Sequence, residues 1–322
     1  MAQMTGIQAI FSAIHEEMLR DQKVFMMGQD LKSGLYGISE TFLQEVGEDR
    51  ILDTPLSETA FFGAAVGAAA AGMRPIVHTV ASFAWVAMDQ IVSQAAKMRY
   101  MFGGQVKLPI VYRYGMLWGI RIAAHHSDRP YPMFMNMPGL KIVLPGSAAD
   151  AKGLMKTAIR EDDPVIFFED RALLYGAKEE MPEGEYTIPF GVGVVRREGT
   201  DVTVVSLGGM ISRVISAANK LEKENISVEV IDPRTLVPLD KEIILRSVAK
   251  TGRLVIVDVA HLTCSAASEI AAMVSDAGFW SLKSPIKRVA THNVHIPCTP
   301  VLEDLVYPTE EKIIKAIKAT LE

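Results

Sequence analysis

Short apolar runs alternate with helix-patterned segments along almost the whole chain, and no other feature of the sequence constrains the fold as strongly. Most of the runs are mainly apolar rather than apolar at every second residue, which is typical of strands buried on both faces of a parallel sheet. We therefore predict an α/β fold with two domains, each built on a mainly parallel sheet with helices on both faces. The predicted strands are 24–28, 75–80, 108–113, 140–145, 165–168, 202–208, 228–232, 254–259 and 286–290. The predicted helices start after the capping residues Thr5 and Ser57 and span 84–101, 148–160, 210–224, 240–250, 264–277 and 309–321.

The alternation is interrupted once, by a segment rich in glycine, proline and charge that has no helical period, at 173–200. Such a composition is typical of a linker that runs over the surface between two domains. The chain has 322 residues, which is enough for two hydrophobic cores. We predict a first domain over 1–180, a linker over 181–200 and a second domain over 201–322.

The composition excludes several classes of protein. A hydrophobic content of 49% with 22% charged residues indicates a globular chain, and a net charge of −5 with dispersed Lys and Arg predicts no nucleic-acid partner. The mean hydropathy is +0.20, but the longest uncharged runs, 59–73 and 75–88, are shorter than the roughly 20 residues of a membrane span. We therefore expect no membrane segment and instead expect apolar surface buried between subunits. The start of the chain predicts an amphipathic helix rather than a secretion signal, and two cysteines without a CxxC motif fit a reducing, cytoplasmic location.

Glu58 is the first candidate for chemistry, because it places a carboxylate at the start of an apolar helix rich in glycine and alanine. An acid at this position commonly complements the helix dipole, and the residues alone favour that interpretation. The alternative is a buried carboxylate that exchanges a proton with a cofactor nitrogen. The glycines of this helix do not follow the G-x-G-x-x-G spacing of a dinucleotide site.

His125 and His126 form the second candidate, in a turn-like stretch between two predicted strands. Adjacent side chains on an extended segment point apart, and no third ligand follows at a recognisable spacing, so one functional imidazole is favoured over a metal pair. Phe83, at the entry of a predicted helix, would ordinarily be a core residue.

Several stretches then match one family in sequence and order. They are 51–77, 88–105, 126–170, 228–240, 247–258 and 296–304. They resemble the beta subunit of the thiamine-diphosphate-dependent 2-oxo acid dehydrogenase first component, a transketolase-like family that includes pyruvate, branched-chain and acetoin dehydrogenases. The resemblance implies a transketolase-like pyrimidine-binding domain over 1–180 and a transketolase C-terminal domain over 201–322.

The resemblance also implies a shared cofactor and several partners. Thiamine diphosphate would lie between this chain and an alpha subunit that binds Mg²⁺ and the diphosphate, within an alpha2-beta2 heterotetramer. The enzyme would cleave a bond next to the carbonyl of a small 2-oxo acid or acetoin-like substrate and pass the acyl group to a lipoyl acyltransferase core. The alternatives are half of a split transketolase and a non-catalytic docking subunit. The first lacks a clear cluster of phosphate-binding residues, and the presence of Glu58, Phe83 and His126 argues against the second.

By the same resemblance, Glu58 would bond to the aminopyrimidine ring as a proton relay, Phe83 would stack on that ring, and His126 would face the substrate or the lipoyl group. His125, Ser127 and Asp128 would line the substrate channel, where His-His-Ser-Asp replaces the family's Gln-His-Ser-Gln. Gln29 replaces a family glutamate. These differences favour an acetoin-type or otherwise divergent substrate. Some relatives bind potassium at the positions of Ile110, Ala158, Glu161 and Asp163.

Overall fold

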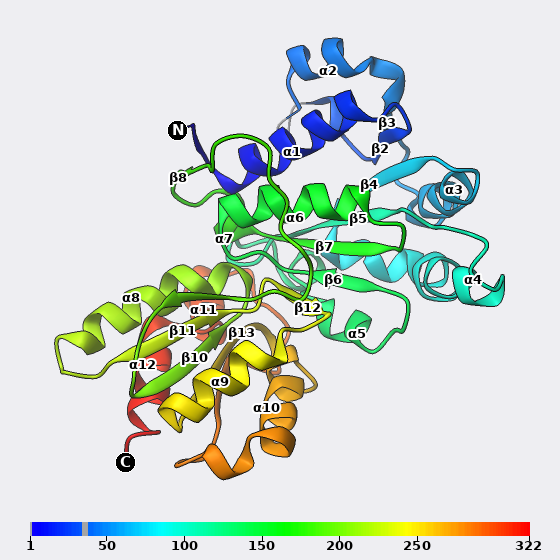
Figure 1. Cartoon of the computed structure of the whole chain (residues 1–322). Helices are drawn as coiled ribbons and strands as arrows, with labels where there is room; N and C mark the ends of the chain where they lie inside the picture. Colours follow the sequence, from blue (N-terminus) through cyan, green and yellow to red (C-terminus); the bar gives the residue numbers. More distant parts are fainter. Residues whose placement is uncertain (1, 34–37) are drawn as a thin grey trace.

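The fold is built on two sheets, seen one above the other in Figure 1, and the computed structural model describes residues 2–33 and 38–322. The first sheet has seven strands in the order β12-β6-β7-β5-β4-β2-β3. All neighbours are parallel except β12, which runs antiparallel to β6. The strands are β2 (Val24–Gly28), β3 (Ile51–Asp53), β4 (Arg74–Val80), β5 (Val111–Met116), β6 (Lys141–Val143), β7 (Val165–Asp170) and β12 (Thr235–Val237).

The second sheet has five strands in the order β14-β13-β10-β11-β9, in which only β9 is antiparallel. They are β9 (Val194–Arg197), β10 (Val202–Ser206), β11 (Val228–Asp232), β13 (Leu254–His261) and β14 (Lys287–Thr291). A short antiparallel ribbon also joins β1 (Gln3–Met4) to β8 (Glu179–Glu180). The prediction of an α/β fold with two mainly parallel sheets is confirmed.

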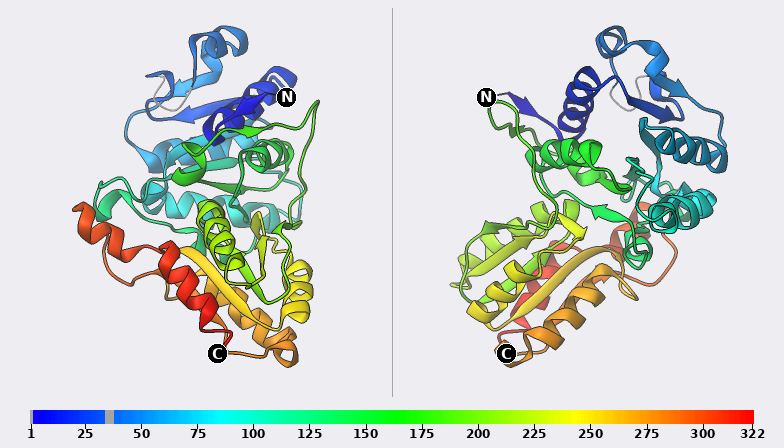
Figure 2. Two further views of the ribbon diagram at one scale, coloured as in Figure 1. Left: turned by 90° about the vertical axis from the view of Figure 1, so that its left-hand side faces the viewer. Right: turned by 45° about the vertical axis from the view of Figure 1, so that its right-hand side comes forward.

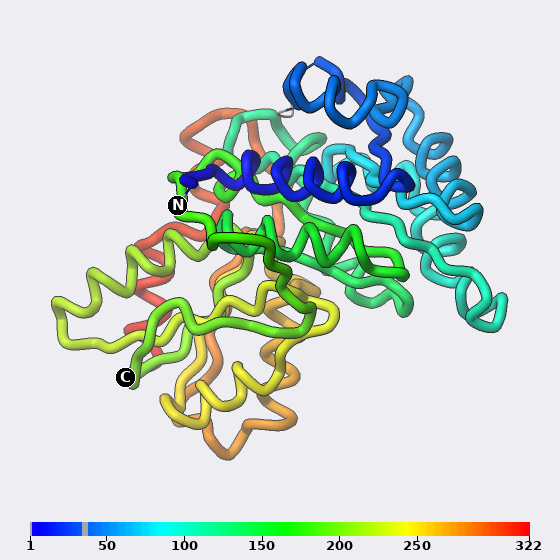
Figure 3. The backbone as a smooth tube through the Cα atoms, turned by 45° about the horizontal axis from the view of Figure 1, so that its top comes forward, coloured from blue at the N-terminus to red at the C-terminus, as the bar shows by residue number. Residues whose placement is uncertain are grey.

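Helices cover both faces of each sheet (Figure 2). In the first sheet, alternate strand residues point to opposite faces, so Ile76 and Val111 pack with the buried residues of α1, while Val77 and Tyr112 pack with those of α3. Helix α1 begins at a capping box formed by Thr5 and Gln8, as the sequence predicted, and lies along α6 (Figure 3). The helices of this half are α1 (Gly6–Arg20), α2 (Glu40–Val46), α3 (Glu58–Ala70), α4 (Ala96–Met101), α5 (Tyr131–Met135), α6 (Ala148–Arg160) and α7 (Arg171–Leu174). Around the second sheet lie α8 (Ile211–Glu222), α9 (Lys241–Thr251), α10 (Ala266–Ala277), α11 (Pro300–Val306) and α12 (Glu310–Lys318). Among the helices of the described residues, none combines the length and the apolar character that crossing a membrane requires.

The single helix predicted over 84–101 is wrong. The chain there forms a 3₁₀ segment η3 (Ala81–Ala87), a π-helical segment η4 (Asp89–Ala95) and then α4. All three winding modes leave a similar apolar pattern in the sequence, and the tertiary contacts of η3 described below select the tighter turn. Ser57 also does not cap α3 through its side chain, although the helix starts where it was predicted.

The predicted linker contains more structure than its composition indicates. Strand β9 falls within 181–200 and pairs with β11, so the second sheet begins inside this segment. Strand β12, which the sequence analysis missed, follows β11 and returns to the edge of the first sheet beside β6. The two halves of the chain therefore share a sheet edge as well as a packed core.

Candidate active site

The candidate residues gather at the carboxyl edge of the first sheet. Gln29 follows β2, Glu58 follows β3, η3 with Phe83 follows β4, and a loop over 117–128 follows β5. These four strands are neighbours and parallel, so their carboxyl ends lie along one edge. In open α/β sheets ligands bind outside this edge, which makes it the expected place for a site. We call residues 117–128 the histidine loop.

Glu58 is a buried carboxylate with one bonded oxygen. Its residue is 8% exposed at the first turn of α3, and its Oε1 accepts a hydrogen bond of 3.1 Å from Nε2 of Gln29. Among the described residues Gln29 is the one that bonds to this carboxylate, so Oε2 is available to a ligand. The neighbouring Thr59 donates from its hydroxyl to the carbonyl of Val86 at 2.9 Å, which ties the start of α3 to η3.

Phe83 brings the two histidines together. Its ring centroid lies 5.4 Å from that of His125 and 5.2 Å from that of His126, and both imidazoles meet it edge-on. The imidazole centroids are 5.0 Å apart. His125 is exposed and His126 half-buried, on the single 3₁₀ turn η5 (Ala124–His126). Phe83, His125 and His126 thus form one aromatic cluster, although 42 residues separate Phe83 from His125 along the chain (125 − 83).

Ser127 and Asp128 hold this cluster in place. The hydroxyl of Ser127, whose residue is 1% exposed, donates to the carbonyl of Ala123 at 2.7 Å, so this side chain supports the loop from within. The amide of Asp128 donates to the hydroxyl of Ser82 at 3.1 Å, and its carboxylate accepts from Nε1 of Trp85 at 3.2 Å. The last two bonds, one to Ser82 and one to Trp85, attach the histidine loop to η3.

Arg129 and Tyr131 extend the support to the second sheet, and the sequence analysis missed both as supporting residues. Nε of buried Arg129 donates to the carbonyl of Val259 at 3.0 Å, and its guanidinium lies over the ring of Tyr307. The hydroxyl of Tyr131 bonds to the carboxylate of Asp258. Burial raises the pKa of Asp258 and also raises the pKa of Tyr131.

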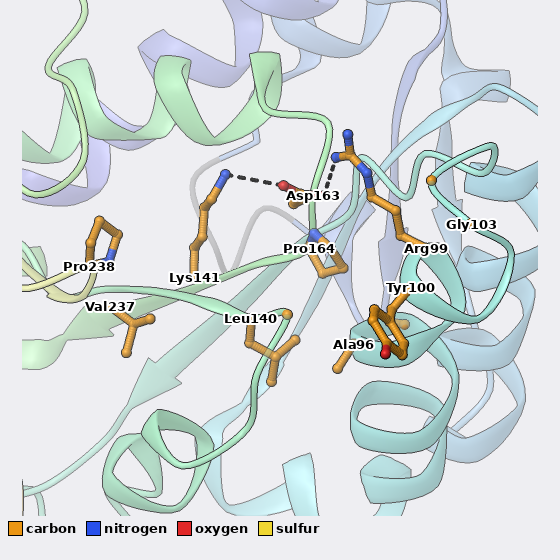
Figure 4. A pocket seen from close by; sticks show the side chains of 13 residues that line it. Ala96, Arg99, Tyr100, Gly103, Leu140, Lys141, Asp163, Pro164, Val237 and Pro238 are labelled. Atoms are coloured by element: carbon orange, nitrogen blue, oxygen red, sulfur yellow. Dashed lines mark hydrogen bonds and ion pairs between the residues drawn. The ribbon is translucent and has the colours of Figure 1, made fainter.

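The predicted potassium ligands lie near one another where α6 ends and β7 begins, but they are already bonded. The carbonyl of Ile110 accepts from the amide of Val165 at 2.9 Å, and that of Ala158 accepts from the amide of Glu161 at 3.3 Å. The carboxylates are paired with cations: Glu161 with Lys141 at 2.7 Å, and Asp163 with Lys141 at 3.4 Å and with Arg99 (Figure 4).

Two more cationic side chains enter the same corner. Arg74 donates from Nη2 to the carbonyl of Glu161 at 2.6 Å and from Nε to that of Ile159 at 2.9 Å. The hydrogen bond from Lys107, at 2.6 Å, holds the pKa of Asp162 below its usual value. Four side-chain cations therefore surround three carboxylates, so the carboxylate oxygens at this corner are paired within the chain. Within the described part of the chain, no cluster of three or more His, Cys, Asp or Glu residues suits a metal ion.

The hollow shown in Figure 4 is separate from the candidate site. It has a volume of about 740 Å³ and lies between α4, the start of β6 and the end of β12. Its charged lining residues, Arg99, Lys141 and Asp163, are those already paired with one another. Glu58, Phe83 and the histidine loop do not line it, so its size carries no information about the chemistry at the sheet edge.

Comparison with known proteins accounts for both halves of the chain. Residues 2–176 match the family model described as "Transketolase, pyrimidine binding domain", and residues 191–313 match "Transketolase, C-terminal domain". Among solved structures, an inactive beta4 tetramer of a split-gene transketolase superposes with a TM-score of 0.82, covering 99% of this chain and 99% of that chain. At 22% identity, this likeness concerns the fold alone.

The curated relatives are closer. The beta subunit of acetoin:2,6-dichlorophenolindophenol oxidoreductase of Cupriavidus necator is 45% identical, covering 100% of this chain and 99% of the relative. The beta subunit of the pyruvate dehydrogenase E1 component of Rickettsia felis is 44% identical over 98% of each chain. The 2-oxoisovalerate dehydrogenase beta subunit of Bacillus subtilis is 40% identical over 100% of each chain.

Proposed function

Since the chain belongs to the transketolase-like beta subunits of the acetoin and 2-oxo acid dehydrogenases, we propose that its sheet-edge site holds the aminopyrimidine end of thiamine diphosphate. The observation that carries this proposal is the buried carboxylate of Glu58, whose one oxygen is fixed by Gln29 while the other is available. A carboxyl group held in this way can keep a proton at a ring nitrogen. The residues described at this edge fit the group, because they offer a carboxylate, an aromatic ring and an imidazole.

Each side chain then has a distinct task. When bound, thiamine diphosphate supplies a carbon that adds to the substrate carbonyl and accepts the electrons of the broken carbon–carbon bond. Glu58 holds and returns a proton at the pyrimidine nitrogen. Phe83 orients that ring through its aromatic face. His126 moves a proton near the reacting carbon, since an imidazole can donate or accept one near neutral pH.

His125 is the proposed specificity residue of the site. It is the exposed member of the aromatic cluster, so it is the imidazole that an incoming substrate meets first. Asp128, further along the same loop, accepts a hydrogen bond from Nε1 of Trp85. We propose a small 2-oxo acid or acetoin-like ketone as the substrate and a lipoyl acyltransferase as the acceptor of the acyl group. Similar identities to the acetoin-oxidising relative, at 45%, and to the pyruvate dehydrogenase relative, at 44%, support both substrate classes.

An alpha subunit is the proposed partner over this edge. Apolar side chains are exposed beside the site, and among them are Leu56 at 80% exposure, Trp85 and Val86. At the end of α4, Tyr100 is 90% exposed, and Met101 and Phe102 follow it. Apolar surface of this kind marks an interface between subunits. The alpha chain would bring Mg²⁺ and the diphosphate-binding half, giving an alpha2-beta2 heterotetramer.

The isolated chain should therefore bind thiamine diphosphate poorly and assemble on addition of an alpha subunit. Calorimetry on the chain alone should give no saturable binding in the micromolar range, with or without Mg²⁺, and sedimentation of the co-expressed pair should give a tetramer. Tight, Mg²⁺-dependent binding by the chain alone would contradict the half-site. A stable monomer that gains nothing from an alpha chain would contradict the proposed interface.

The two histidines should separate in function. In the assembled enzyme, His126→Ala should depress turnover by at least about 100-fold, the lower end for a lost proton-transfer group, without slowing the exchange of the cofactor's thiazolium proton. His125→Gln should mainly change the ratio of kcat/KM values for acetoin-like ketones and 2-oxo acids. Steady-state assays on both substrate classes, with proton exchange followed by NMR, measure these effects. Full turnover in His126→Ala together with an unchanged substrate profile in His125→Gln would make the pair structural.

A further inference from the structure

The histidine loop is bound by a side chain that lies far from it in the sequence. Glu303 lies on α11, which follows β14 of the second sheet, and its residue is 0% exposed. Its Oε1 accepts a hydrogen bond of 3.0 Å from the amide of Gly119, and its Oε2 accepts one of 3.1 Å from the amide of Arg121. One carboxylate thus bonds two backbone groups of a loop 184 and 182 residues earlier in the chain. Figure 2 shows α11, in orange-red, alongside the first half of the chain.

The backbone of this loop has a shape that it would not adopt unaided. Gly119, Arg121 and Ala123 have φ values of 76°, 65° and 60°. The left-handed region is unfavourable for Arg and Ala because of their Cβ atoms, and residues persist in it only when their surroundings fix them. Alternating backbone conformations of this kind turn amides toward one point and form an anion-binding concavity. In this chain the carboxylate of Glu303 fills that concavity.

The clamped segment leads directly into the aromatic cluster. Ala123 is the last of these three residues, and its carbonyl accepts a hydrogen bond of 2.7 Å from the hydroxyl of Ser127. The turn η5, with both histidines, lies between Ala123 and Ser127. A shift of the backbone at Gly119 or Arg121 would therefore displace His126 relative to Phe83. The exposed side chain of Asp304, the next residue of α11, pairs with the guanidinium of Arg121 at 3.1 Å and, among the described residues, bonds to no backbone amide of the loop. The same guanidinium lies 3.5 Å from Oε2 of Glu303.

We propose that Glu303 is a positioning residue, which sets the place of His126 through the backbone amides of Gly119 and Arg121. This inference rests on the proposed role of His126. Among the described residues, the partners that bond to Glu303 are Gly119, Arg121 and Tyr307. Neither Glu58 nor Phe83 is one of these partners, so we expect Glu303 to act on the step that uses the histidine. The second half of the chain thereby controls the geometry of a site built on the first sheet.

Glu303→Gln in the assembled enzyme tests the proposal, because an amide can accept one of the two bonds but turns its own N–H₂ toward the other donor. Turnover should fall by about 10- to 100-fold, the cost of a displacement of roughly 1 Å. Thiazolium proton exchange should stay at the wild-type rate. Backbone hydrogen–deuterium exchange should accelerate in peptides covering 117–128 and remain unchanged in α1 and α6. The matched control, Asp304→Asn, should change none of the three, since an exposed ion pair contributes little.

A second pair of variants changes the same contact on its loop side, at Arg121. Arg121→Pro removes the amide N–H that donates to Glu303, and proline cannot adopt a positive φ. Arg121→Gly keeps this N–H, and glycine adopts a positive φ freely. The proline variant should reproduce Glu303→Gln. The glycine variant keeps the amide bond but loses the guanidinium, which lies 3.5 Å from Oε2 of Glu303 and donates to the carbonyl of Gly119 at 2.7 Å, so its loss of turnover should be smaller than that of the proline variant. Unchanged turnover in Glu303→Gln or Arg121→Pro would overturn the proposal, and so would an equal loss of turnover and thiazolium exchange. His126→Ala is measured in parallel: if it retains full turnover, the role of His126 fails, whereas an inactive His126→Ala beside a fully active Glu303→Gln refutes only the positioning by Glu303.

Discussion

Glu58→Gln should lower the turnover of the assembled enzyme by about 10²–10⁴-fold, the usual cost of losing a proton relay. The amide can still bond to Gln29 and to a ring nitrogen, so the fold and the cofactor content should persist, but it cannot pass on a proton. Steady-state kinetics, with cofactor content and circular dichroism measured on the same sample, check the prediction.

Glu40→Gln is the matched control for this substitution. Glu40 is also an acid in the first turn of a helix, α2, but it is exposed and belongs to no site. If Glu58 served only to complement a helix dipole, both variants would lose a similar small amount of stability and neither would lose turnover. Wild-type turnover in a cofactor-loaded Glu58→Gln enzyme would return Glu58 to that role.

Glu169→Gln should destabilise the chain by about 3–5 kcal/mol, the cost of leaving a buried charge without its partner. Glu169 at the end of β7 bonds to Arg113 of β5 through two oxygens, with Nη2 to Oε2 at 2.9 Å, and both residues are 1% exposed. The guanidinium also lies 4.6 Å from the ring centroid of Phe11. Burial, with a contribution from the charge of Arg113, holds the pKa of the neighbouring His78 well below its usual value.

Urea unfolding followed by circular dichroism measures this loss. Glu222→Gln is the control, because Glu222 pairs with Arg197 at 3.1 Å with a side chain that is 69% exposed. An exposed pair contributes about 0–1 kcal/mol, so the control should change the free energy of unfolding by no more than that. A loss in Glu169→Gln as small as in the control would show that the pair at β5 and β7 is not isolated from water.

The sequence predicts those parts of the fold that depend on neighbouring residues. Strand β13 begins with four consecutive apolar residues and α1 carries its own cap at Thr5, so both were found from local pattern alone. Strand β12 has only three residues and pairs with β6, which lies about 90 residues earlier, so no local signal marks it. The winding of η3 is likewise selected by distant contacts, from Thr59 to Val86 and from Trp85 to Asp128.

The candidate site, too, could be predicted from the sequence only in part. Glu58, Phe83 and His126 were assigned their roles through the family resemblance. The residues alone favoured structural roles for Glu58 and Phe83, and for the histidine pair they favoured one functional imidazole without saying which. The structure adds that Phe83 and both histidines form one cluster, and that Gln29 bonds to Glu58 across 29 residues. Glu303 belongs to the stretch 296–304 that matches the family. Its two bonds to the histidine loop depend on how the two halves of the chain pack, so they could not be predicted from the sequence.

Exchange of the thiazolium proton for deuterium, followed by NMR in the assembled and cofactor-loaded enzyme, tests the central claim most directly. This exchange reports the step assigned to Glu58 and is independent of substrate. The account predicts slow exchange in Glu58→Gln, by a factor comparable to its loss of turnover, and wild-type exchange in His126→Ala. Wild-type exchange in a folded, cofactor-loaded Glu58→Gln enzyme would contradict it.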